Sequence, residues 1–109
     1  MKKATKTNKR AKPPRASSFT KQFLKDWQSL THSGRYDMAS LKEAMMLLVA
    51  NDAPLGAEWL DHALKGEWSD HRECHIGGDF LLIYRLHIEG SQEHIQFVRT
   101  GTHSQLFGV

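Results

Sequence analysis

Histidines are the residues of this chain best suited to chemistry at neutral pH. There are seven in 109 residues, and an unperturbed imidazole titrates near pH 6.5, so it can serve as acid or base. Metal-free cleavage of RNA is one reaction that needs such groups. A base takes the 2′-hydroxyl proton, an acid protonates the leaving 5′-oxygen, and a cation offsets the phosphate charge. Acid–base chemistry is therefore the first hypothesis.

A metal site is the main alternative use of these side chains, because His71, Cys74 and His75 lie close together in the sequence. In a strand that rises about 3.3 Å per residue, His71 and His75 are roughly 13 Å apart. One zinc ion, bound at about 2.0–2.1 Å by each nitrogen, cannot hold both. On a helix they would be adjacent, but the Gly77-Gly78 pair that follows favours a strand and a hairpin. We therefore expect no metal and no other cofactor.

Two amphipathic helices are expected in the first half of the chain. From Ser18 onward, aromatic residues recur at every fourth position between Phe19 and Trp27, which is the spacing of one helix face. After a connection that contains a glycine, apolar residues recur at intervals of three and four within residues 41–49. A second helix should therefore end near Asn51.

A small antiparallel sheet is expected in the second half. Residues 54–70 are poorly periodic and predict a long ordered loop. Glycine turns at residues 77–79 and 90–91 then separate β-branched and aromatic segments, as in a hairpin meander. The expected strands are residues 72–76, 80–87 and 95–100, with a possible short addition at 16–18 and a short tail from Gly101. The fold class is α+β, with two N-terminal helices packed on the sheet.

Length and composition restrict the class of protein. A chain of 109 residues has room for one domain and one modest core. It contains neither an apolar run near the roughly 20 residues of a membrane span nor the apolar segment of a secretory signal, so we expect a cytoplasmic protein without membrane contact. The single cysteine, Cys74, cannot form an internal disulfide.

The charges are unevenly distributed along the chain. Residues 1–15 hold seven lysines or arginines and no acid, whereas the remainder holds eight basic and twelve acidic residues. We expect residues 1–15 to be a disordered basic arm and residues 16–109 to form the single domain. Such an arm could attract RNA phosphates through counterion release. The alternative is an extension that only improves solubility.

Three segments carry a resemblance to a known family. They are DHALKG at residues 61–66 with Trp68, DFLLIYR at 79–85, and RTGTH at 99–103 followed by LFG at 106–108. In order and spacing these elements resemble the YafQ branch of the RelE-like toxins, over roughly residues 19–108, although the helical half matches only in pattern. The resemblance implies two helices on a twisted antiparallel sheet, ribosome-dependent cleavage of messenger RNA, and neutralisation by a cognate antitoxin.

The resemblance also implies a catalytic site. Carried over residue by residue, the family's catalytic histidines fall on His62, His75 and His103. Its acidic partner falls on Asp79 and its tail aromatic on Phe107. The acid and base cannot be assigned between the histidines from the sequence.

Four further residues are expected to contact the substrate. By the same resemblance, Phe80 stands where members of that branch have tryptophan, which keeps a flat surface for base stacking but lacks the indole N–H. Arg72, Arg85 and Arg99 are the cationic candidates for phosphate contact.

Several of these residues have a structural alternative. Asp79 could serve only as a turn residue after two glycines. Phe107 could close the edge of the core, and Arg99 could pair with an acidic side chain. The histidines outside the motifs are expected to be surface or packed residues: His32, His71, His87 and His94.

The expected function is that of a toxin of a type II toxin–antitoxin system. It would be a ribosome-dependent, metal-independent endoribonuclease that cleaves mRNA by histidine acid–base catalysis, with an antitoxin, the ribosome and mRNA as partners. In complex with the antitoxin it would form a hetero-oligomer. One alternative is a gyrase-inhibiting toxin of the related ParE branch, although the histidines argue against it. Another is a non-catalytic RNA-binding or ribosome-binding module.

Overall fold

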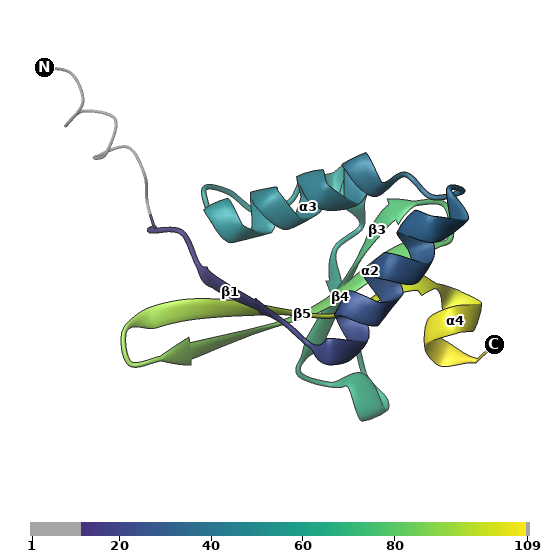
Figure 1. Ribbon diagram of the computed structural model, residues 1–109. Helices are drawn as coiled ribbons and strands as arrows, with labels where there is room; N and C mark the ends of the chain where they lie inside the picture. Colours follow the sequence, from purple (N-terminus) through teal and green to yellow (C-terminus); the bar gives the residue numbers. More distant parts are fainter. Residues whose placement is uncertain (1–11, 109) are drawn as a thin grey trace, which may run out of the picture.

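The computed structural model describes residues 12–108 (Figure 1). Residues 1–11, most of the predicted basic arm, lie outside this range. The elements in chain order are β1 (Ala16–Phe19), α2 (Lys21–Ser33), α3 (Met38–Ala50), the 3-10 helix η1 (Ala57–Trp59), β2 (His62–Ala63), the 3-10 helix η2 (Gly66–Trp68), β3 (His71–Gly77), β4 (Phe80–Glu89), β5 (Gln92–Thr102) and α4 (His103–Phe107). The α+β class, the two N-terminal helices and the meander of β3, β4 and β5 are confirmed.

The sheet is mixed and not only antiparallel as expected, because one pair of strands is parallel. Its strand order is β1-β5-β4-β3-β2, and β1 pairs with β5 in parallel, Ala16 opposite His94 and Phe19 opposite Phe97. Parallel neighbours need a long connection, and here both helices and three other strands separate the two. The possible short strand at residues 16–18 is thus confirmed. Its own sequence does not show that it runs parallel to its neighbour.

The structure contains two short elements where the sequence predicts irregular chain. The expected loop at 54–70 contains β2, which pairs with β3 through only two residues, too few to show a period. The expected tail contains α4, where the Thr102 side chain accepts from the Gln105 N–H and the Gln105 side chain accepts from the Thr102 N–H. This capping box satisfies two backbone donors at the helix start.

The first helix begins later than the apolar spacing predicts. Phe19 belongs to β1, and Thr20 caps α2 by accepting a hydrogen bond from the Phe23 N–H at 2.9 Å. The Thr20 hydroxyl also donates to the Val98 carbonyl at 2.7 Å, which joins the helix start to β5. Phe19 still stacks on Phe23, with ring centroids 5.5 Å apart, so the aromatic spacing is continued across a strand–helix junction.

Helices α2 and α3 pack on one face of the sheet and form the main core with it (Figure 1). Each large apolar side chain buried there contributes about 1.5–3 kcal/mol to stability. The buried residues are Phe23 and Leu30 of α2, Leu41, Ala44 and Leu48 of α3, Trp59, and Cys74, Phe80, Leu82, Tyr84, Ile95 and Phe97 of the sheet. The opposite face, which we call the open face, carries a smaller cluster of Leu81, Ile83 and Leu106.

Arg15, the last residue of the predicted arm, is tied to the folded domain. Its guanidinium donates to the Leu48 carbonyl at 2.6 Å and to the Glu93 carboxylate at 3.1 Å. Its backbone N–H donates to the Val49 carbonyl at 2.8 Å. Within residues 12–108, no helix has the length and apolar character to cross a membrane.

Candidate functional site

Two neighbouring strands, β2 and β3, bring two histidines and a glutamate together on the open face. In β3, His75 lies opposite Leu81 and Glu73 opposite Ile83, and both apolar partners belong to the open-face cluster. His62 of β2 lies opposite Glu73. Directly opposed residues of an antiparallel pair share a face, so His62, Glu73 and His75 are neighbours although 13 positions separate the two histidines in the sequence.

Glu73 lies between the two imidazoles and is only 4% exposed. One carboxylate oxygen is 3.4 Å from Nε2 of His62 and 3.5 Å from Nε2 of His75. The ring centroids are 6.0 Å apart. A carboxylate is rarely buried to this degree without a partner, and the Glu73 carboxylate lies beside a ring nitrogen of each histidine. Sequence reasoning missed Glu73, although its alternation with His75 in a strand is a usable signal.

His103 adds a third imidazole, 6.2 Å from the His75 ring. It is the first residue of α4, and Asp79 in the β3–β4 turn accepts hydrogen bonds from its backbone N–H at 3.1 Å and from its ring Nδ1. These two bonds, the one from the ring first, lower the pKa of the Asp79 carboxyl. Asp79 is therefore both a turn residue and the partner of His103.

The RTGTH segment fixes His103 through its backbone. The hydroxyl of buried Thr100 donates to the Leu81 carbonyl at 2.8 Å. Gly101 has φ +153°, and a Cβ there would lie 2.6 Å from the Gln105 side-chain oxygen, so only glycine permits the cap. Thr102 then completes the capping box and starts α4 at His103.

Two aromatic side chains border the histidines. Phe107 lies 6.1 Å from His103 and 5.8 Å from Trp68 between ring centroids, the latter in an edge-to-face arrangement. Phe107 and Trp68 are both half-buried and pack against the open-face cluster. Phe107 thus closes the edge of the core and also presents an aromatic edge beside the site.

Arg99 is the cation most firmly held near the site. Its guanidinium makes two hydrogen bonds to Asp26 of α2, at 2.8 and 3.1 Å. Because a guanidinium has five N–H donors, three remain after this ion pair. Arg99 lies opposite Ile83, in the same row of the sheet as Glu73.

Arg85 is on the same face but farther from the histidines. It lies opposite His71, four residues along β3 from His75, or about 13 Å. Within residues 12–108 Arg85 makes no ion pair.

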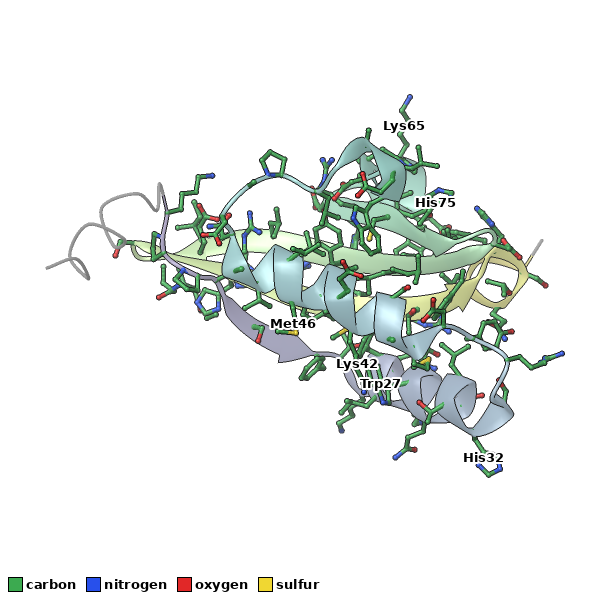
Figure 2. The ribbon with its side chains drawn as sticks, turned by 90° about the horizontal axis from the view of Figure 1, so that it is seen from above. Trp27, His32, Lys42, Met46, Lys65 and His75 are labelled. Carbon is green, nitrogen blue, oxygen red and sulfur yellow. The ribbon has the colours of Figure 1, made fainter. Side chains whose placement is uncertain are left out.

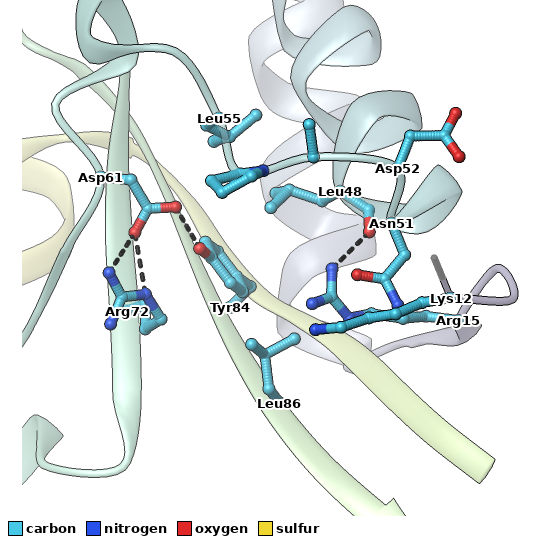
Figure 3. A pocket seen from close by; sticks show the side chains of 12 residues that line it. Lys12, Arg15, Leu48, Asn51, Asp52, Leu55, Asp61, Arg72, Tyr84 and Leu86 are labelled. Atoms are coloured by element: carbon cyan, nitrogen blue, oxygen red, sulfur yellow. Dashed lines mark hydrogen bonds and ion pairs between the residues drawn. The ribbon is translucent and has the colours of Figure 1, made fainter. Parts of the chain in front are cut away.

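Two of the predicted substrate contacts lie on the face covered by the helices. Arg72 alternates with Glu73, and its guanidinium pairs with Asp61, which also accepts a hydrogen bond from the Tyr84 hydroxyl. This network lines a pocket between β3, β4 and the end of α3 (Figure 3). Phe80 is 5% exposed and packs on Tyr36. The structure therefore does not bring Arg72 or Phe80 to the histidines.

The remaining histidines lie apart from this cluster. His32 is exposed at the end of α2 and points away from the sheet, far from His75 (Figure 2). His71 packs edge-on against Trp68 and lies within 3.3 Å of the Ser69 carbonyl. His87 and His94 face one another at the far end of the β4–β5 hairpin.

The site lies within a chain whose relatives are known. Residues 15–108 match the model of a protein family described as the bacterial toxin of type II toxin–antitoxin systems, YafQ. The chain belongs to the YafQ family. A family member from Escherichia coli strain K12, an mRNA interferase toxin, is 40% identical over 90 residues, which cover 83% of this chain and 92% of the relative.

Solved structures of similar proteins agree with the fold. YafQ in the E. coli DinJ–YafQ complex has a TM-score of 0.75 at 39% identity, covering 86% of this chain and 99% of that one. A metal-bound toxin from Helicobacter pylori has a TM-score of 0.71 at 35% identity, covering 85% and 99%. The resemblance drawn from the sequence motifs is confirmed.

Three residues of this site also form a possible ligand set for a metal ion. The nitrogen and oxygen atoms that His62, Glu73 and His75 could offer all lie within 4.8 Å of one another. Two imidazoles and a carboxylate are ligands that zinc and copper accept. His71 and Cys74 do not belong to this group, so the histidines nearest in sequence are not those nearest in space.

Proposed function

We propose that this YafQ-family chain is the toxin of a type II toxin–antitoxin pair and cleaves mRNA by acid–base catalysis with its histidines. The observation that carries the proposal is the spacing of His75 and His103, whose rings are 6.2 Å apart on an accessible face. Such a pair can flank a phosphodiester, with one ring beside the ribose 2′-hydroxyl and the other beside the leaving 5′-oxygen. Proton transfer needs each oxygen within about 2.6–3.2 Å of a ring nitrogen.

The reaction is an internal displacement at phosphorus. One of His75 and His103 takes the proton of the 2′-hydroxyl as its oxygen bonds to phosphorus, and the other protonates the 5′-oxygen as its bond to phosphorus breaks. The products are a 2′,3′-cyclic phosphate and a 5′-hydroxyl, and no water enters this step. Glu73 and His62 position His75, and Asp79 positions His103 through Nδ1, which leaves Nε2 for the proton transfer.

The charged and aromatic neighbours bind the RNA. Arg99 has three N–H donors that do not bind Asp26. These donors stabilise the charge that builds on the reacting phosphate. Arg85, about 13 Å along the strand, contacts a neighbouring phosphate. Phe107 stacks on a base beside the cleaved bond, since stacking tolerates any base. Arg72 and Phe80 support the fold beneath the site.

The partners follow from the same surface. A cognate antitoxin covers the open face and inhibits cleavage, in line with the E. coli relative solved in complex with DinJ. The ribosome presents the message in the cytoplasm. The five basic residues of positions 1–11 add affinity for ribosomal RNA through counterion release and take no part in proton transfer.

Metal binding at His62, Glu73 and His75 is the competing use of the site. A bound transition metal would supply a Lewis acid and an activated water. The proposed chemistry instead needs free ring nitrogens, so it predicts cleavage that proceeds without metal.

The decisive experiment incubates purified protein with a defined message, with and without ribosomes, in EDTA. The proposal expects ribosome-dependent cleavage in EDTA that yields cyclic phosphate and 5′-hydroxyl ends. A 5′-phosphate end together with loss of activity in EDTA would show metal-activated water instead. Intact RNA under all conditions, with inhibited gyrase, would favour the ParE-like alternative.

A further inference from the structure

A second cluster of possible metal ligands lies at the far end of the β4–β5 hairpin, away from the proposed catalytic site. The two strands are joined by Gly90 and Ser91, and Gly90 has φ +63°, the sign needed at the first central residue of a type II′ turn. The hairpin extends away from α4 (Figure 1). Its tip carries His87 and Glu89 on β4 and His94 on β5.

The strand register places these three side chains on one face. His87 lies directly opposite His94, and Glu89, two residues from His87, points to the same side. The imidazole rings are stacked, with centroids 4.9 Å apart and planes inclined by 15°. A Glu89 oxygen lies 3.0 Å from Nε2 of His94. The ligand atoms of all three residues lie within 4.8 Å of one another.

We propose that His87, Glu89 and His94 form a site for a divalent transition metal, with Zn²⁺ as the expected ion. Two neutral imidazoles and one carboxylate make a ligand set found in zinc proteins, and a fourth position stays open to water. Tetrahedral bonds of about 2.0–2.2 Å require the ligand atoms to approach to roughly 3.3 Å. The Glu89 side chain is 70% exposed and His87 is exposed, so both can rotate to close the site.

This site is independent of the proposed catalytic cluster. His87 is six residues along β4 from Leu81, the strand partner of His75, which is about 20 Å. One ion therefore cannot bridge both clusters. An ion at the tip would link the two strands of the hairpin and leave the acid–base residues free.

The experiment uses the tag-free full-length chain in which H62Q and H75Q have removed two ligands of the other cluster. Calorimetric titration with ZnCl₂ at neutral pH should show one ion per chain. Adding H94Q should weaken zinc binding by at least the roughly 10- to 100-fold that loss of an outer-shell partner costs. The histidine side-chain ¹⁵N resonances of His87 and His94 should shift with zinc.

Matched variants make the outcome clear. H32Q changes an exposed histidine elsewhere and should leave zinc affinity unchanged. H87Q and E89Q alter exposed side chains and should weaken binding even if H94Q fails to fold. Absence of zinc binding in the H62Q/H75Q chain, or an affinity unaffected by H87Q and E89Q, would overturn the proposal and leave Glu89 as the ion-pair partner of His94. RNA cleavage by H87Q is expected to match that of the unmodified chain, so the two proposals can fail separately.

Discussion

Asp79 accepts hydrogen bonds from both the backbone N–H and the ring Nδ1 of His103. The first bond holds the start of α4 and the second fixes which ring nitrogen faces the open side of the site. The Asp79 side chain is 58% exposed, so solvent screens its charge. Its main effect is therefore to orient the His103 ring. This relation makes a turn residue part of the proposed machinery.

The first prediction is that Asp79→Ala slows cleavage by less than His103→Ala does. Orientation is one part of the roughly 10²- to 10⁴-fold that a proton-transfer group contributes. Asp79→Asn retains an acceptor oxygen and should keep more activity than Asp79→Ala. Single-turnover cleavage rates with ribosomes check this order. Equal rates for Asp79→Ala and the unmodified chain would remove Asp79 from the site.

The same contact has a defined pH dependence. Because the His103 bonds lower the pKa of Asp79 below its ordinary value of 3.8, the contact stabilises the fold fully above that value and is lost as pH falls below it. In Asp79→Ala, the part of the acid unfolding that comes from this contact should be absent. The dependence of stability on pH near neutrality should be the same as in the parent. Circular dichroism across an acid titration measures this.

The second prediction concerns the proton-transfer groups themselves. His75→Ala and His103→Ala should each slow cleavage by about 10²- to 10⁴-fold, whereas His32→Ala should have little effect. His32 is the matched control because it is exposed on α2, far from the site. His32→Ala should keep the thermal stability of the parent, and circular dichroism should show that His75→Ala and His103→Ala remain folded. A His103 variant that remains fully toxic would instead favour a non-catalytic binding module.

The sequence predicts the helices and the meander because each has enough residues to show its period. It does not predict β2, whose two residues pair only because β3 offers an open edge. The parallel placement of β1 likewise depends on where the helices return the chain. A capping box is visible in the sequence at Thr102 and Gln105, so α4 could have been expected.

The site was predicted through motif resemblance more than through chemistry. His62, His75 and His103 come from three different segments. The strand register brings His62 and His75 together, and the start of α4 places His103 beside His75. Glu73 could have been found from its alternation with His75. The face of the sheet on which a side chain lies determines whether it can reach the site. Arg72 is adjacent to Glu73 in sequence, yet it lies on the opposite face of the sheet.

The third prediction is that excess Zn²⁺ slows cleavage and EDTA restores it. An ion held by His62, Glu73 and His75 would occupy nitrogen lone pairs that acid–base catalysis needs. The H87Q variant should be inhibited to the same degree, because its altered residue is at the hairpin tip. Cleavage rates measured with and without each reagent test this. A rate that rises with zinc would contradict the metal-free mechanism.

The fourth prediction is that Cys74 resists thiol reagents in the folded protein. It is fully buried, and burial, assisted by the charges of Asp61 and Glu73, raises the pKa of its thiol to about 12. At pH 8 the thiol is then almost entirely protonated, whereas the thiolate is the reactive form. Modification by a chromogenic disulfide reagent should be slow in buffer and rapid in denaturant. Rapid modification of the folded chain would show that the core opens.

The last prediction separates the two roles of Asp26, whose side chain is 10% exposed. It accepts two hydrogen bonds from Arg99 and one from the Thr100 N–H at 3.1 Å. Asp26→Ala should lower the free energy of unfolding by about 1.5–3 kcal/mol, the range for hydrogen bonds to charged groups. It should also slow cleavage because the Arg99 guanidinium loses its fixed position.

Arg99→Lys is the matched variant for this ion pair. Lysine keeps the positive charge but not the planar fork that binds Asp26 and a phosphate together. It should therefore retain most of the stability and lose much of the cleavage rate. Urea unfolding and single-turnover cleavage, measured on both variants, resolve the two effects. If Arg99→Lys cleaves at the parental rate, the Arg99 pair with Asp26 is structural only, and Arg85 becomes the cation to test at the reacting phosphate.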